Sequence, residues 1–172
     1  MQNPNIILIG MPASGKSTVG VILAKILGMD FLDTDLVIQK KEGLRLEEII
    51  TQKGTEGFLA VEEKAVTAVN VCNTVIATGG SVVYSEAAMR HLKKDGITFY
   101  LKVEKEALFR RLSDVRQRGV VLKPGETLEA LYNERILLYE KYADHIVSED
   151  GFTIEDTVQE TIRQLEGHIL NR

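Results

Sequence analysis

A glycine-rich octapeptide near the N-terminus constrains this chain more than any other feature. Residues 10–17 are GMPASGKS, which matches G-x-x-x-x-G-K-[ST], a pattern whose backbone N–H groups can surround a polyphosphate. The octapeptide follows a short apolar run at residues 6–9 and precedes an amphipathic segment at residues 16–27. A strand before such a loop and a helix after it provide the context in which the pattern binds phosphate, so the sequence predicts a nucleotide site.

The side chains of this loop predict how ATP and Mg²⁺, the expected cofactors, are bound. Lys16 is expected to reach the β- and γ-phosphates, and Ser17 is expected to offer its hydroxyl to Mg²⁺. Ala13 stands where many small kinases have glycine, which raises the question of whether the backbone there still needs a positive φ. The predicted nucleotide-binding residues in the loop are Gly10, Ala13, Ser14, Gly15, Lys16, Ser17 and Thr18.

Short β-branched runs alternate with amphipathic helical segments along the chain. The apolar runs lie at residues 6–9, 75–76, 97–101 and 145–147. The helical segment at residues 16–27 places Ile26 on its apolar face, and a C-terminal segment does the same with Ile154 and Ile169. This alternation predicts an α/β fold with a parallel sheet covered on both faces and with ligands at the carboxyl ends of the strands.

Length and composition exclude several classes of protein. The 172 residues, 44% of them hydrophobic, suffice for a single domain over residues 1–172. No apolar run approaches the roughly 20 residues that span a bilayer, and the N-terminus has no signal-peptide pattern, which predicts a cytoplasmic protein with no membrane partner. The 21 basic and 25 acidic residues form no long block of one sign, which argues against nucleic-acid binding. The one cysteine, Cys72, rules out an internal disulfide and is expected to be buried in a helical stripe over residues 58–72.

Two carboxylates and a glycine turn are candidates for the acceptor side of a phosphoryl transfer. Asp33 and Asp35 leave a predicted strand on the same face, so one can hold the waters of Mg²⁺ while the other accepts the proton of an attacking hydroxyl. The alternative is a helix N-cap followed by an acid in the first turn. Residues 77–81, ATGGS, form a strand end and a glycine turn that lets a ligand approach the backbone.

Charged residues on apolar helical faces are a further signal. Arg135 lies within the apolar stripe of residues 128–142, and a buried guanidinium must meet a carboxylate or phosphate, either an internal acid or a ligand. Glu62 is a second inward charge, in the stripe of residues 58–72. The basic, glycine-containing segment at about residues 113–125 is predicted to be a lid over the phosphates.

Together, GMPASGKST, FLDTD, EGF followed by EE, ATGG, the basic segment and ERILLYEKYAD resemble the shikimate kinase family over nearly the whole chain. The resemblance implies a P-loop NTPase fold of the nucleoside-monophosphate-kinase type, a three-layer α/β/α architecture with a five-stranded parallel sheet, a lid at 113–125 and an acceptor-binding region at about 34–62. It also implies a monomer that phosphorylates the 3-hydroxyl of the small molecule shikimate.

Carried over by position, the resemblance assigns individual roles. Asp35 would contact the accepting hydroxyl and be catalytic together with Lys16 and Arg118, the lid arginine. Asp33 would assist Mg²⁺ beside Ser17, and Arg111 would lie beside adenine. The substrate-binding positions would be Asp35, Leu59, Gly79, Gly80, Ser81 and Arg135, where Arg135 is one of two arginines that grip the substrate carboxylate.

Three positions depart from the family pattern. Leu59 stands where the second carboxylate-binding arginine is expected, which also leaves Glu62 without its usual partner. Ser81 replaces the third glycine of the turn, and the lid has no proline after its arginine. Loss of one charge-assisted bidentate contact would weaken acceptor binding by about 2–4 kcal/mol, unless another cation such as Arg45 or Lys53 replaces it.

Other functions therefore stay open from the sequence. The chain could be a kinase of another small polyol or hydroxy acid, which Leu59 and Ser81 favour. It could also be an inactive ATP-binding regulatory protein, although the complete set of Lys16, Ser17 and the two aspartates argues against this. A nucleoside monophosphate kinase would need more basic contacts for an acceptor phosphate.

Overall fold

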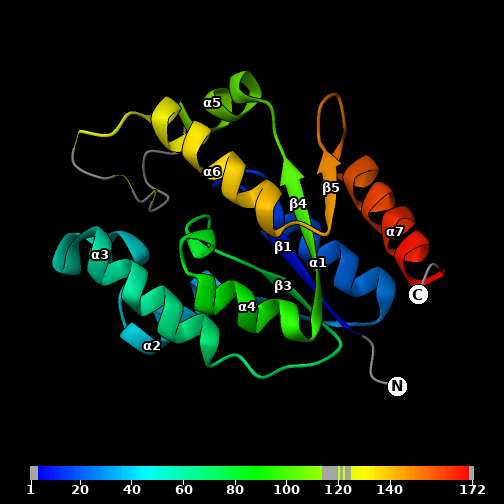
Figure 1. Ribbon diagram of the computed structural model, residues 1–172, viewed down its shortest axis with the longest axis horizontal. Helices are drawn as coiled ribbons and strands as arrows, with labels where there is room; N and C mark the ends of the chain where they lie inside the picture. The colour runs from blue at the N-terminus through cyan, green and yellow to red at the C-terminus, as the bar shows by residue number, and fades with distance from the viewer. Residues whose placement is uncertain (1–3, 114–119, 121, 123–124, 171–172) are drawn as a thin grey trace.

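The chain is described by a computed structural model that covers residues 4–113, 120, 122 and 125–170 (Figure 1). Its one sheet has the strand order β2-β3-β1-β4-β5, and every neighbouring pair is parallel. The strands are β1 (Asn5–Ile9), β2 (Asp30–Asp33), β3 (Thr74–Ala77), β4 (Gly96–Lys102) and β5 (His145–Ser148). The helices are α1 (Lys16–Leu27), α2 (Thr34–Glu42), α3 (Leu46–Thr67), α4 (Glu86–Lys94), α5 (Lys105–Ser113), α6 (Leu128–Tyr142) and α7 (Ile154–Leu170), with the 3₁₀ turn η1 (Val82–Tyr84) after β3.

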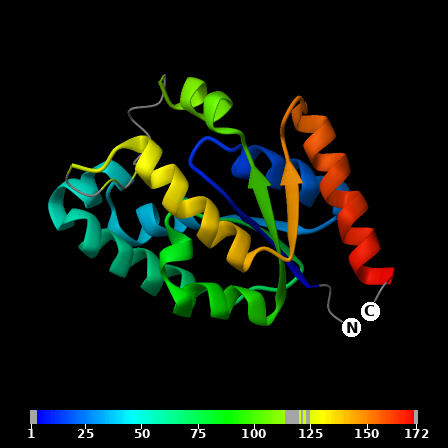
Figure 2. The ribbon, with the colours of Figure 1, turned by 45° about the horizontal axis from the view of Figure 1, so that its top comes forward.

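Alternate side chains of the central strand β1 enter two separate cores. Ile7 and Ile9 pack into the core that α3, α4, η1, α5 and α6 help to form, whereas Ile6 and Leu8 pack into the core that faces α1 and α7. Figure 2 shows α4 and α6 on one side of the sheet and α1 on the other. The structure thus has the three-layer α/β/α architecture with a five-stranded parallel sheet that the sequence predicts.

The strand order explains where a ligand can bind. Strands β2 and β3 lie between β1 and one edge of the sheet, and the later strands β4 and β5 lie between β1 and the other edge. The order reverses next to β1, and the loop that follows β1 lies at this switch point, where ligands of open α/β sheets bind. The loop leads directly into α1, and local backbone conformation ends that helix at Gly28, whose φ of 65° is left-handed and whose N–H donates to the Ala24 carbonyl.

Several sequence predictions fail at the ends of helices. Helix α3 ends at Thr67, so Cys72 lies in the following connection and is exposed; the prediction of a buried thiol is wrong. The side chains of Ile26, Ile154 and Ile169 are 53%, 45% and 56% exposed, and each lies at or next to an end of α1 or α7. No helix among the described residues is long and apolar enough to cross a membrane.

Candidate active site

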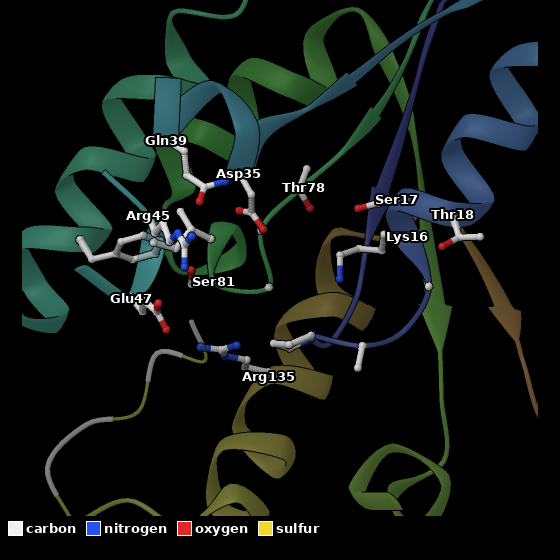
Figure 3. Close-up of a pocket in the computed structure, with 17 residues that line it drawn as sticks. Lys16, Ser17, Thr18, Asp35, Gln39, Arg45, Glu47, Thr78, Ser81 and Arg135 are labelled. Atoms are coloured by element: carbon white, nitrogen blue, oxygen red, sulfur yellow. The ribbon is translucent and has the colours of Figure 1, made fainter. Parts of the chain in front are cut away.

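A cavity of about 390 Å³ opens at the carboxyl ends of β1 and β3 (Figure 3). Its walls come from the loop after β1 and the start of α1, from α2, from the turn before α3 and from α3 itself, from the turn after β3, and from α6. Elements far apart in the sequence therefore share one site, and each wall contributes at least one polar or charged group, as in a site that binds two polar ligands.

The loop after β1 has the backbone conformation of a phosphate cradle. Gly10, Ala13 and Gly15 have φ values of 150°, 65° and 81°, all in the range that favours glycine. The question raised by Ala13 is thereby answered: its backbone is left-handed although it carries a Cβ, a conformation that costs about 1 kcal/mol. The loop keeps its shape without the third glycine by accepting this strain.

Lys16 lies at the first position of α1 and folds back over the loop. Its Nζ donates hydrogen bonds to the carbonyls of Gly10 and Met11, at 2.9 and 2.8 Å, and lies 3.4 Å from Ser14 Oγ. Burial lowers the pKa of Lys16 to about 8, against the opposing effect of the nearby Asp35 carboxylate. The ammonium is thus held in the loop by carbonyl acceptors, next to the space that the loop surrounds.

Asp33 acts both as a helix cap and as a partner of the loop. Its Oδ1 accepts hydrogen bonds from the N–H groups of Asp35 and Leu36, at 2.9 and 3.4 Å, and so caps α2. Its Oδ2 accepts a hydrogen bond from Ser17 Oγ at 2.6 Å. The capping and functional interpretations of Asp33 are therefore compatible. Two adjacent oxygen donors, a hydroxyl and a carboxylate, are also the ligand types that Mg²⁺ prefers, so this pair fits a magnesium site.

Asp35 lies in the first turn of α2 and lines the cavity opposite Lys16 (Figure 3). Its pKa is raised to about 6, first by burial and then by the Asp33 carboxylate, while Lys16 opposes the shift. A carboxylate with a pKa near 6 is a stronger base than an ordinary aspartate and is still ionised at neutral pH. Gln39, one helical turn later on the same face, also lines the cavity. Sequence reasoning missed Gln39, although its spacing of four residues from Asp35 could have indicated it.

Glu62 has a partner that the sequence did not suggest. Ser81 Oγ donates a hydrogen bond to Glu62 Oε2 at 2.6 Å, and Glu62 is only 2% exposed. Burial raises the pKa of Glu62 to about 7, and the hydrogen bond from Ser81 partly offsets the shift. Among the described residues, Glu62 Oε1 has no hydrogen-bond partner. Ser81 thus lines the cavity and also satisfies one oxygen of the buried acid behind it.

The glycine turn after β3 brings backbone close to these acids. A Cβ on Gly79 would overlap Glu62 Oε1 and lie 2.8 Å from Asp35 Oδ1, and a Cβ on Gly80 would lie 2.8 Å from Pro12 Cδ. Other hydrogen bonds fix the turn: the Gly79 N–H donates to Thr34 Oγ1 at 3.1 Å, and the Tyr139 hydroxyl donates to the Gly80 carbonyl at 2.5 Å. A side chain at either position would displace one of these neighbouring groups, so glycine keeps the turn close to both walls.

Arg135 projects from α6 into the cavity, as its place in the helical stripe predicts (Figure 3). It is 1% exposed, its Nε donates to the Tyr84 hydroxyl at 3.4 Å, and its guanidinium lies 5.3 Å from the centre of the Tyr84 ring. Leu59 is half-buried on α3 but does not line the cavity, whereas Arg45 does.

The other predicted arginines lie elsewhere. Arg111 of α5 donates from Nη1 to Glu149 Oε2 at 2.9 Å and to the Ala13 carbonyl at 3.3 Å, so it braces the phosphate cradle from outside. Burial raises the pKa of Glu149, and its pairing with Arg111 opposes that shift. Arg118 and most of the predicted lid lie outside the described residues. Within that segment, the Leu122 carbonyl accepts a hydrogen bond from Thr55 Oγ1 of α3 at 3.2 Å.

Fold and cavity together define a class of protein. A phosphate cradle at the N-terminus of α1, a lysine held within it, a hydroxyl–carboxylate pair beside it and an acid facing it constitute a P-loop phosphotransferase site. The second half of the cavity contains Arg135 and the glycine turn, which packs against Pro12 of the cradle, and it can hold a small acceptor.

Comparison with known proteins identifies the family. The family model described as shikimate kinase matches residues 12–166, and the chain belongs to that family. A shikimate kinase of Thermodesulfovibrio yellowstonii is 38% identical over 165 residues, which cover 94% of this chain and 95% of the relative. The family uses ATP as its phosphate donor.

Solved structures agree with this assignment. A shikimate kinase from Acinetobacter baumannii in complex with shikimate superposes with a TM-score of 0.84 at 30% identity, covering 96% of this chain and 94% of that chain. The enzyme from Aquifex aeolicus superposes with a TM-score of 0.82 at 33% identity, covering 98% and 99%. A thymidylate kinase from Candida albicans, at a TM-score of 0.66 and 15% identity, shares the fold alone.

Proposed function

We propose that this enzyme transfers the γ-phosphoryl group of ATP to the 3-hydroxyl of shikimate, and that the residues lining the cavity perform the roles described below. The observation that carries the proposal is the arrangement of Lys16, Asp35 and Arg135 around one cavity. In this proposal, a cation for the phosphates, a base and a cation for the acceptor carboxylate would lie on three different walls. Phosphoryl transfer to shikimate requires these three groups, because ATP brings phosphates and shikimate brings a carboxylate and several hydroxyls.

The loop residues bind and orient the donor. Backbone N–H groups between Gly10 and Thr18 point toward the phosphates, and Lys16 exchanges its carbonyl partners for the β- and γ-phosphates as ATP binds. Positioning dominates catalysis of phosphoryl transfer, because the transition state is loose and most of its charge lies on phosphate oxygens. The proposed nucleotide site also includes Arg111, which holds the loop in shape through Ala13.

Asp35 orients the acceptor and takes its proton. As the bond between the β,γ-bridging oxygen and the γ-phosphorus breaks, the shikimate oxygen bonds to that phosphorus, and the hydroxyl proton moves to Asp35 Oδ. ADP leaves with the bridging oxygen. Gly79, Gly80 and Ser81 form the floor of the acceptor half, and Arg135 pairs with the shikimate carboxylate.

Ser17 and Asp33 would hold Mg²⁺, Ser17 directly and Asp33 through bound water. The ion would neutralise charge on the phosphate oxygens during transfer. Ser17 Oγ donates a hydrogen bond to Asp33 Oδ2 at 2.6 Å, so the two oxygen donors are adjacent.

The remaining assignments extend the proposal beyond the described contacts. Residues 34–62 form the acceptor-binding region, and residues 113–125 form a lid that brings Arg118 to the transferring phosphoryl group. The whole chain of residues 1–172 is one domain. A monomer in the cytoplasm stays a prediction, and light scattering tests the monomer against the chain mass of 19.2 kDa.

A coupled assay of ADP release tests the function. With Mg·ATP, we expect turnover with shikimate, and the phosphorus–proton coupling in NMR spectra of the product should locate the phosphate at the 3-oxygen. Gluconate, homoserine and nucleoside monophosphates serve as competing acceptors. Faster turnover of one of these would reassign the acceptor, and tight ATP binding without any turnover would indicate a regulatory protein.

A further inference from the structure

We propose that Arg45 is the second cation of the acceptor site and that, opposite Arg135, it binds the acceptor's carboxylate in place of an arginine at position 59. This inference rests on the proposed function, since it concerns recognition of the same acceptor. It assigns a specificity role to a residue in the turn between α2 and α3, a different element from the one that carries Leu59.

The position of Arg45 carries the proposal. Arg45 lines the cavity together with Asp35 and Arg135, whereas Leu59 does not line it. Figure 3 shows Arg45 and Arg135 reaching the cavity from different walls, one from the α2–α3 connection and the other from α6. Two guanidinium groups on different walls can hold a planar carboxylate between them, each through charge-assisted hydrogen bonds.

Local structure gives no reason for an arginine at position 45. The residue is the N-cap of α3, where Ser, Thr, Asp or Asn would accept a hydrogen bond from the first turn. An arginine side chain has no acceptor, and a cation at a helix N-terminus is disfavoured by the helix dipole. Its backbone is fixed by the N–H hydrogen bond to Glu48 Oε2 at 2.7 Å. The side chain itself makes no hydrogen bond or ion pair with any residue that the structure describes, so it is available to a ligand.

The charges around the cavity require a second cation for an anionic acceptor. With Lys16 assigned to the phosphates, the remaining charged side chains among the described lining residues are Asp35 and Glu47 against Arg45 and Arg135. Without Arg45, Arg135 would be the one remaining cation among these lining residues, beside the carboxylates of Asp35 and Glu47, and the acceptor would add a third carboxylate. Arg45 makes the lining groups of the acceptor half neutral before binding, so that a monoanion is not repelled.

The alternative cation, Lys53, is already paired. Its Nζ lies 2.5 Å from Glu42 Oε2, and it does not line the cavity. The buried Glu62 does not require a cation at position 59 either, because Ser81 satisfies one of its oxygens and its raised pKa favours the neutral acid. The departures at Leu59 and Ser81 are thus consistent with a role for Arg45: a hydroxyl binds the acid behind the floor, and the second cation comes from the α2–α3 turn.

The test combines a charge-removing variant with an uncharged acceptor. Arg45→Met removes the charge and the donors while keeping an unbranched side chain, and we expect kcat/KM for shikimate to fall about 10- to 100-fold, mainly through KM, with KM for ATP unchanged. Shikimate methyl ester keeps the hydroxyls but lacks the charge, so Arg45→Met should change its turnover less than about threefold. Lys53→Met and the exposed Arg90→Met are the matched controls and should behave as the parent protein does.

The outcomes separate this inference from the proposed function. If the parent protein turns over shikimate and Arg45→Met leaves its kcat/KM unchanged, or reduces ester and acid turnover equally, the role of Arg45 is refuted while the function stands. An equal loss in Lys53→Met also refutes it. Absence of shikimate turnover in the parent protein refutes the function itself. Unchanged calorimetric ATP binding in Arg45→Met shows that the variant is folded.

Discussion

The donor half of this cavity is formed mainly by main chain, whereas the acceptor half is formed mainly by side chains. The donor half consists mainly of main chain from one short segment, and its lysine is already bound to carbonyls of the same loop. The acceptor half consists of side chains from α2, α3, the turn after β3 and α6, including Asp35, and the buried Glu62 lies behind its floor. Burial raises the pKa values of both of these acids. The donor half therefore depends on backbone conformation, whereas the acceptor half can exchange its side chains.

The largest expected effect is on the donor side. Lys16→Met removes the charge that the cradle holds for the phosphates, and we expect kcat to fall about 1000-fold. Because the proposed acceptor-binding groups lie on other elements than Lys16, the calorimetric affinity for shikimate should change less than about threefold. Lys25→Met, at the exposed end of α1, is the control. A comparable loss of shikimate binding would show that the two halves are not separable.

Asp35→Asn is the corresponding change on the acceptor side, with an expected fall in kcat of about 100-fold and little change in the KM for ATP. In the parent protein, Asp35 has a pKa of about 6, so lowering the pH through 6 protonates the base. We expect kcat/KM to fall about tenfold per pH unit below that value. Asp35→Asn should lack this acidic limb in a pH–rate profile; its persistence would assign the limb to another group.

Glu62→Gln tests the cost of the buried acid. The folded-state pKa of Glu62 is about 7, raised from 4.5, so the folded state holds a proton that the unfolded chain releases, and stability is lost as pH rises from about 4.5 to 7. Glu62→Gln removes this loss. We therefore expect the free energy of unfolding of the variant, relative to that of the parent protein, to be about 2 kcal/mol higher at pH 8 than at pH 5. Urea unfolding at both pH values measures it, with the exposed Glu56→Gln as control. An equal gain at the two pH values would contradict the assignment.

The smallest effect returns to the donor loop. Ala13→Gly relieves a left-handed backbone at φ 65°, and after the entropy that glycine loses on folding we expect about 0.5 kcal/mol of added stability. Ala60→Gly, in the exposed middle of α3, should instead destabilise by about 1 kcal/mol. Thermal unfolding of both variants compares them. If both destabilise equally, the strain at Ala13 is absent and the loop depends less on backbone conformation than proposed.

The difference between the two halves also explains what the sequence could predict. The octapeptide and the β-branched runs determine local conformation within a few residues, so the strand–loop–helix order around the octapeptide and the positions of the β-branched strands are confirmed by the structure. Arg135 was predicted to face inward because a helical period places it there, and it is 1% exposed.

Contacts between elements far apart in the chain could not be predicted from the sequence. The hydrogen bond between Ser81 and Glu62 joins the turn after β3 to α3, and no local pattern encodes such a pairing. The sequence offers several possible cations, such as Arg45 and Lys53, and in the structure Arg45 lines the cavity whereas Lys53 does not. Cys72 was misplaced because apolar periodicity continues past Thr67, although the helix does not.

The packing of Gly79 limits how this enzyme could be redesigned for a new alcohol. Even one methyl group at that position would meet Asp35 Oδ1 at 2.8 Å and push the proton acceptor out of line. Gln39, Leu46 and Phe58 also line the cavity, but Phe58 is 2% exposed and belongs to the core between α2 and α3. A library that randomises positions 39 and 46 should return variants with new acceptors, whereas randomising position 79 should return glycine.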